Sequence, residues 1–122
     1  METKINKEFV HWAYKKIYTI RMFEERLLQL FSEGKLCGTT HTYIGQEATA
    51  VSVLWNSHED DIIFSNHRCH GHFIARHGNY RNLLAEIMGK TEGICGGIGG
   101  SQQFYFENFY SNGVQGGYLP IA

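Results

Sequence analysis

Apolar residues recur at every third or fourth position from Phe9 to Phe31, which is the spacing of one face of an α-helix. Asn6 suits the N-cap position, and Gly34 suits the position just after a helix end. The pattern predicts a helix of roughly 26 residues. A helix of this length is expected to pack on a neighbouring subunit or a larger body. Its polar side is expected to form local, solvated ion pairs among Arg21, Glu24, Glu25 and Arg26.

Shorter patterns follow in residues 36–92. Small side chains from 45 to 55 predict a second helix, and the apolar run 61–64 predicts a short strand. Helical spacing resumes after the strand and reaches a cap at Gly78. Asn79 is a candidate N-cap for a further helix that ends at Gly89. These elements predict an α/β fold that is mostly helical within this chain.

The remaining segment, residues 93–122, is predicted as loops rich in glycine and aromatic residues. Eight of the 14 glycines lie between Gly93 and Gly117. Ordering so much glycine costs backbone entropy, so close approach to a ligand or a partner chain is expected to compensate. A flexible surface loop is the alternative. The aromatic run from Phe104 to Tyr110 is expected in a core or an interface.

Composition indicates which kinds of partner and which cellular compartment are expected. Lys and Arg total 11 against 12 for Asp and Glu, so neither nucleic acid nor an anionic membrane is an expected partner. The polar N-terminus predicts no signal peptide, and no apolar run approaches the ~20 residues that cross a bilayer. Three separated cysteines without a C-x-x-C pair argue against a disulfide framework. A cytoplasmic location is expected.

The turn after the predicted strand, residues 64–71, carries the strongest candidate chemistry. Ligands of open α/β sheets bind at the carboxyl ends of strands, where helix N-termini favour anions. Arg68 offers a planar fork for phosphate or carboxylate, and His67 and His70 can donate or accept hydrogen bonds beside it. The turn is therefore a candidate anion pocket, with a solvated polar turn as the alternative.

A metal site is a further interpretation of the same turn. Imidazole and thiolate are good zinc ligands, although neighbouring ligands on one turn rarely converge. The candidate ligands are His67, Cys69, His70 and His72.

Six short motifs resemble, in order and spacing, those of one enzyme family. They are Arg-Met-Phe-Glu-Glu-Arg at 21–26, Gly-Gln-Glu-Ala at 45–48, His-Arg-Cys-His-Gly at 67–71, Ala-Glu-Ile-Met-Gly-Lys at 85–90, Gly-Gly-Ser at 99–101 and Leu-Pro-Ile-Ala at 119–122. Nearly the whole chain is similar to the N-terminal part of the alpha subunit of thiamine-diphosphate-dependent 2-oxo-acid dehydrogenases, the pyruvate, acetoin and branched-chain group. The resemblance implies that residues 1–122 form one incomplete domain, the N-terminal half of a thiamine-diphosphate-binding doubly wound domain.

The resemblance also implies roles for individual residues. His67 and Arg68 fall where the family contacts the cofactor diphosphate, and Gly113 and Gln115 fall where backbone groups lie along the thiamine. The implied catalytic residues near the substrate channel are His41 and His70. The magnesium-binding Gly-Asp-Gly motif of the family would lie beyond Ala122, so the Mg²⁺ ligands are expected from another chain.

Departures from the family pattern concern charge. The family tyrosine before the arginine is His67 here, and Gly96 and Ile98 replace lysines of the glycine loop. Gln103 replaces the histidine that follows Gly-Gly-Ser-Met. The glycine loop has therefore lost much of its usual positive charge.

The resemblance implies a split alpha-type subunit that contributes to decarboxylation of a 2-oxo acid with acyl or ketol transfer. Separate chains, the C-terminal half of the alpha-type subunit and a beta-type subunit, would complete a hetero-oligomer that is inactive without them. The alternative is a non-catalytic remnant or scaffold subunit that keeps the interface without turnover.

Overall fold

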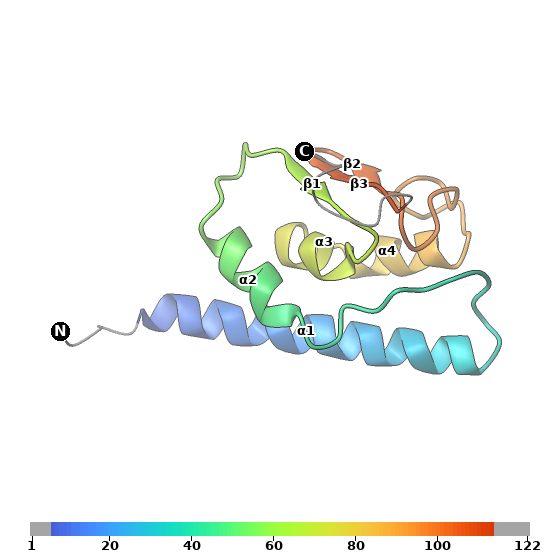
Figure 1. The fold of residues 1–122 in the computed structure, drawn as a ribbon, viewed down its shortest axis with the longest axis horizontal. Helices are drawn as coiled ribbons and strands as arrows, with labels where there is room; N and C mark the ends of the chain where they lie inside the picture. The colour runs from blue at the N-terminus through green and yellow to red at the C-terminus, as the bar shows by residue number, and fades with distance from the viewer. Residues whose placement is uncertain (1–5, 114–122) are drawn as a thin grey trace.

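The structure, a computed structural model, describes residues 6–113, and their elements stack in three layers (Figure 1). The first layer is the long helix α1 (Lys7–Ser32). The second contains α2 (Glu47–Trp55), α3 (His70–Arg76) and α4 (Tyr80–Ile87). The third is a small sheet of β1 (Ile63–Ser65), β2 (Tyr105–Phe106) and β3 (Phe109–Ser111). The described part of the chain is thus a helix-dominated α/β structure.

The predicted first helix is confirmed, with both of its ends. The Asn6 side chain accepts hydrogen bonds from the backbone N–H groups of Glu8 and Phe9 at 3.0 and 3.1 Å. Gly34 follows the helix with a φ of 69°, a conformation that glycine adopts without strain. α1 packs against α2 and α3, and Ala13, Ile20, Leu27 and Leu30 of its apolar face are buried. Among residues 6–113, no helix is long and apolar enough to cross a bilayer.

The prediction of local, solvated ion pairs on the polar side of α1 is wrong in part. Arg21 instead pairs with Glu47 of α2, with Nε and Oε1 2.7 Å apart. Glu24 is fully buried, and its Oε1 lies 2.8 Å from His70 Nδ1 of α3. Glu24 lies one turn after the buried Ile20, so the face of α1 that packs on the core includes a carboxyl group.

Three short strands form a sheet in the order β1-β3-β2. β1 runs parallel to β3, with Phe64 opposite Tyr110 and their rings stacked at 5.2 Å. β2 pairs antiparallel with β3. The strand near residues 61–64 is confirmed, but residues 93–122 were predicted as loops and this missed β2 and β3. Strands of two or three residues are too short to show a period-two alternation.

The aromatic run is divided between the core and the surface. Phe104 and Phe109 are buried, and their rings lie 6.0 and 5.3 Å from that of Phe73 in α3. Tyr105, in contrast, is 65% exposed. The run therefore contributes some of its rings to the core against α3 and leaves others at the surface.

The glycine-rich segment closes on a carboxylate of its own chain. Glu86 of α4 is fully buried, and its Oε2 accepts hydrogen bonds from the backbone N–H groups of Cys95 and Gly97 at 2.6 and 2.9 Å. Its Oε1 accepts from the N–H of Gly99 at 2.7 Å. A Cβ at Gly93 would collide with Glu86. The close approach was expected to a ligand or a partner chain, whereas the structure shows it to Glu86 of the same chain, and three charge-assisted hydrogen bonds offset the entropy of ordering the loop.

Candidate functional site

Three of the six predicted site residues, His41, His67 and Arg68, lie together and form a basic cluster. The rings of His41 and His67 meet edge to face with centroids 5.0 Å apart. Arg68 Nη1 donates to the carbonyl oxygen of Thr42 at 2.5 Å, and the Arg68 backbone N–H donates to Asn66 Oδ1 at 2.9 Å. The turn after β1 is thus tied to the segment that precedes α2.

The basic cluster combines a permanent cation with an imidazole that favours its neutral form. Partial loss of hydration lowers the pKa of His41, and the positive potential of His67 and Arg68 lowers that pKa further. The Arg68 guanidinium stays charged at any physiological pH. Within residues 6–113, no acceptor bonds to its Nε or Nη2, so two nitrogens of the fork can bind an anion. This donor set fits a phosphate or a carboxylate.

Replacing Arg68 with glutamine is expected to raise the pKa of His41, because a neighbouring positive charge is removed while an amide donor is kept. The pKa of the His41 ring can be followed by NMR titration of its ring protons. Arg81→Gln, which changes an exposed arginine of α4, is the matched control and should leave that pKa unchanged. If the His41 titration curve is the same in Arg68→Gln and the parent chain, the charge of Arg68 does not affect the pKa of His41.

His72 of α3 links the segment before α2 to strand β1 through hydrogen bonds of its two ring nitrogens. Its Nε2 lies 2.9 Å from Tyr43 Oη, and its Nδ1 lies 2.7 Å from Ser65 Oγ. Burial lowers the pKa of His72 to about 4, so the ring is neutral at physiological pH. A neutral imidazole donates through one nitrogen and accepts through the other, which both hydroxyl groups can match.

The buried neutral His72 is expected to make the fold sensitive to acid. Its folded pKa of about 4 lies below the ordinary value of 6.5. Its stabilising contribution is therefore complete above pH 6.5 and is lost as the pH falls towards 4, by up to about 3 kcal/mol. Urea denaturation at several pH values from 7 to 4 measures this loss. His72→Gln should flatten the pH dependence, whereas His11→Gln, at an exposed position of α1, should not.

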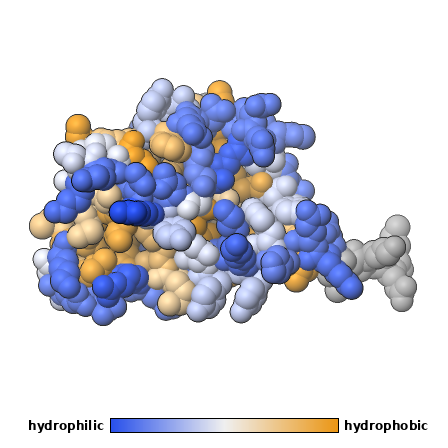
Figure 2. All heavy atoms as spheres, turned by 180° about the vertical axis from the view of Figure 1, so that it is seen from behind, coloured by the Kyte–Doolittle hydropathy of each residue, from blue (hydrophilic) through white to orange (hydrophobic). Residues whose placement is uncertain are grey.

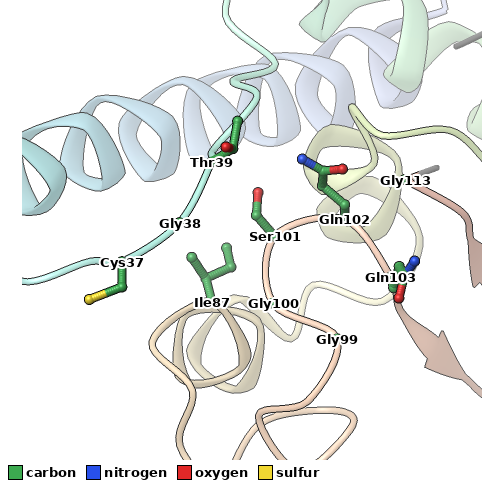
Figure 3. A pocket seen from close by; sticks show the side chains of 10 residues that line it. All are labelled: Cys37, Gly38, Thr39, Ile87, Gly99, Gly100, Ser101, Gln102, Gln103 and Gly113. Atoms are coloured by element: carbon green, nitrogen blue, oxygen red, sulfur yellow. The ribbon is translucent and has the colours of Figure 1, made fainter. Parts of the chain in front are cut away.

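A cavity of about 400 Å³ opens between the segment 37–39 and the loop 99–103 (Figure 3). Figure 3 shows the hydroxyl groups of Thr39 and Ser101 directed into the space between these two segments. Gly113 completes the wall, where a Cβ would collide with the side chain of Gln102. No charged side chain of residues 6–113 lines this cavity. A ligand in this cavity would therefore meet neutral donors and acceptors from these residues.

His70, predicted near the substrate channel, lies directly behind the cavity wall and is fully buried. Its Nδ1 faces Glu24, and its Nε2 lies 3.0 Å from the carbonyl oxygen and 3.1 Å from Oγ of Ser101. Ser101 therefore stands between the imidazole and the cavity. Sequence reasoning placed neither Glu24 nor Ser101 at the site, although the Gly-Gly-Ser motif had marked the position of Ser101.

The remaining predictions for the turn concern Gln115 and a metal. Gln115 lies outside the described residues. Cys69 is buried, which raises the pKa of its thiol to about 12, and its Sγ donates to the Ser101 carbonyl oxygen. His70 and His72 point to different partners, and no three His, Cys, Asp or Glu side chains of residues 6–113 could hold a metal ion. This divergence argues against the zinc interpretation.

Comparison with known proteins gives a consistent set of matches. The profile of the dehydrogenase E1 component family matches residues 15–117. The alpha subunit of acetoin:2,6-dichlorophenolindophenol oxidoreductase from Bacillus subtilis is 40% identical over 97% of this chain and 36% of its own length. The corresponding subunit from Cupriavidus necator is 38% identical over 96% and 36%. The mitochondrial pyruvate dehydrogenase E1 component subunit alpha of Chaetomium thermophilum is 33% identical over 98% and 29%. The chain spans about a third of the length of these relatives.

Proposed function

Because this chain belongs to the dehydrogenase E1 component family, we propose that it supplies the diphosphate side of a thiamine-diphosphate site in an enzyme that acts on a 2-oxo acid. Arg68 carries this proposal. Its charge is permanent, its Nη1 is held by the Thr42 carbonyl, and its two other nitrogens have no acceptor within residues 6–113. A fixed fork with a free edge is suited to bidentate contact with a phosphate group.

The other residues of the proposed site have complementary roles. His67 lies beside Arg68 and can donate a hydrogen bond to the same phosphate. Gly113 lines the cavity without a side chain, so backbone can approach a ligand closely, and Gln115 continues that segment. His41, whose lowered pKa favours the neutral ring, can accept or donate a proton at a ring nitrogen.

Bound thiamine diphosphate would supply the electron sink for decarboxylation of a 2-oxo acid, followed by acyl or ketol transfer. Its Mg²⁺ would take oxygen ligands, and we propose that another chain supplies them; no three His, Cys, Asp or Glu side chains of residues 6–113 lie close enough together to hold a metal ion. This chain would position the diphosphate and exclude water around it. We propose a cytoplasmic enzyme in which this chain acts as part of a split alpha-type subunit.

An apolar groove between α1 and α4 supports assembly with partner chains, namely the C-terminal half of the alpha-type subunit and a beta-type subunit. The groove encloses about 520 Å³, and its lining includes Tyr18, Met22, Phe23, Tyr80 and Leu84. Tyr18 and Tyr80 are 57% and 54% exposed. Figure 2, which views the molecule from behind, shows that hydrophobic side chains gather among hydrophilic ones on that face of the molecule. Exposed apolar patches rimmed by polar groups are typical of protein interfaces.

Cofactor affinity tests the proposal. The chain would be co-expressed and purified with the polypeptides that complete the subunit, and thiamine diphosphate binding measured by calorimetry with Mg²⁺ present. Arg68→Ala is expected to weaken binding at least about tenfold, because hydrogen bonds to a charged group contribute about 1.5–3 kcal/mol. Lys7→Ala, at an exposed position at the start of α1, is the control. Unchanged affinity in Arg68→Ala would instead support the scaffold alternative. The glycine loop also favours that alternative, because Ile98, which is 91% exposed, stands where the family has a lysine.

A further inference from the structure

The hydrogen bonds of His70 determine which of its ring nitrogens carries a proton. Nε2 lies 3.0 Å from the carbonyl oxygen of Ser101, and a carbonyl oxygen can only accept. Nε2 must therefore carry a hydrogen. A protonated Nε2 cannot take a proton from the Ser101 hydroxyl group, so this arrangement is not that of a serine nucleophile with its general base.

A second proton lies on the other side of the ring. His70 Nδ1 and Glu24 Oε1 are 2.8 Å apart, and two unprotonated acceptors would repel each other at this distance. One proton therefore lies between them, on either the imidazole or the carboxyl group. The pair then has no net charge, which suits two side chains with no exposed surface. Glu24 Oε2 has no hydrogen-bond partner within residues 6–113, which also favours a pair without net charge.

This proton count decides how Ser101 presents its hydroxyl group. His70 Nε2–H also lies 3.1 Å from Ser101 Oγ and donates to it, so the hydroxyl hydrogen of Ser101 remains available for another acceptor. Ser101 lines the cavity, and Figure 3 shows its hydroxyl group directed there. The backbone N–H groups of the adjoining Gly100 and Gln102 make no hydrogen bond to another residue of 6–113. The Ser101 hydroxyl group can thus donate a hydrogen bond into the cavity.

We propose that Glu24 and His70 are positioning residues that hold Ser101 as a hydrogen-bond donor to a carboxylate oxygen of a small 2-oxo acid in the cavity. The identity of the ligand rests on the proposed function, whereas the proton arrangement rests on the hydrogen-bond geometry alone. Fixed donors aimed at an oxygen need no reorganisation when a ligand binds, and they act without a charged side chain. Neither buried residue touches the ligand.

The proton arrangement can be tested on the chain itself by ¹⁵N NMR of its histidine side chains, with His70 assigned through His70→Gln. The expected result at pH 7 is an Nε2 resonance of His70 typical of a protonated nitrogen. Glu24→Gln should keep that resonance, because the glutamine amide can donate to Nδ1 and stabilise the same Nε2–H tautomer. An unprotonated Nε2 in the parent chain would overturn the proposal.

Ligand contact is tested by titrating pyruvate and following the backbone amide resonances of residues 100–102. The parent chain and His11→Gln, a change at an exposed position of α1, should respond alike, whereas Ser101→Ala should bind about tenfold more weakly through loss of one hydrogen bond to a charged group. Ser101→Ala keeps the backbone carbonyl that His70 binds, so it should fold. Equal responses in Ser101→Ala and the parent chain, or a stronger response to inorganic phosphate than to pyruvate, would overturn the assignment.

The two proposals can fail separately. Loss of cofactor affinity in Arg68→Ala with no pyruvate response at residues 100–102 would leave the proposed function in place and remove this inference. A Ser101-dependent pyruvate response with unchanged cofactor affinity in Arg68→Ala would leave this inference in place and remove the proposed function. The two readouts use different ligands and different residues.

Discussion

Replacing Glu86 with alanine is expected to lower the free energy of unfolding by about 3–5 kcal/mol, because three backbone N–H groups lose their acceptor at once. Those N–H groups belong to Cys95, Gly97 and Gly99, so the whole glycine loop should lose its conformation. Urea denaturation gives the change in stability. Hydrogen exchange of the loop amides shows whether the loss is local or global.

Two further variants test whether the effect is due to the acceptor oxygens of Glu86. Glu86→Gln keeps the shape but presents an N–H₂ group to at least one of the three donors, and it should fall between the parent chain and Glu86→Ala. Glu92→Ala removes an exposed carboxylate close to the same loop and should change stability by no more than about 0.5 kcal/mol. If Glu86→Ala is as stable as Glu92→Ala and its loop amides are equally protected, the Glu86 carboxylate does not stabilise the loop.

Gly71→Ala is expected to destabilise the fold by about 3 kcal/mol, because an added methyl group would overlap a buried ring. Gly71 lies in α3, and a Cβ there would meet Cε1 and Cγ of Tyr43 at 2.5 and 2.6 Å. Tyr43 is 1% exposed and therefore has no space to move into. The segment before α2, which carries His41, depends on this contact for its position against α3.

A double-mutant cycle with Tyr43→Ala isolates the contact from the helix propensity of residue 71. Without the ring, Gly71→Ala should change sign and stabilise the helix by about 0.5–1 kcal/mol, since alanine is the better helix former. Tyr43→Phe keeps the ring, so Gly71→Ala should remain destabilising in that background. Denaturant midpoints of the single and double variants measure the coupling. Equal effects in the Tyr43→Ala and Tyr43→Phe backgrounds would exclude the ring as the cause.

Local sequence signals predicted most of the helical framework. Apolar spacing and the caps at Asn6 and Gly34 predicted α1, and positive φ values at Gly78 and Gly89 agree with the expected ends of α3 and α4. Asn79 takes the N-cap position of α4, although its side chain makes no capping hydrogen bond. These features depend on hydrogen bonds and side chains within a turn or two of the residue concerned, and neighbouring sequence therefore specifies them.

The candidate site was predicted as a set of residues but not as an arrangement. The motifs indicated the family and named Arg68, His67 and His41, which the structure brings together. They did not indicate that Thr42 holds Arg68, or that a cavity opens beside Ser101. A motif specifies residue types along the chain, whereas the partner of each side chain depends on how distant segments pack.

The sequence by itself determined the long first helix, the order of the helices and the enzyme family of this chain. Only the tertiary structure decided that Glu24 and Glu86 are buried, because their partners come from other segments: His70 lies 46 positions beyond Glu24. A carboxylate is ordinarily expected in solvent, since burying it without a partner costs several kcal/mol. Such a side chain is buried only where the fold supplies hydrogen-bond partners, the His70 ring for Glu24 and the loop N–H groups for Glu86, and those partners come together only once the segments have packed.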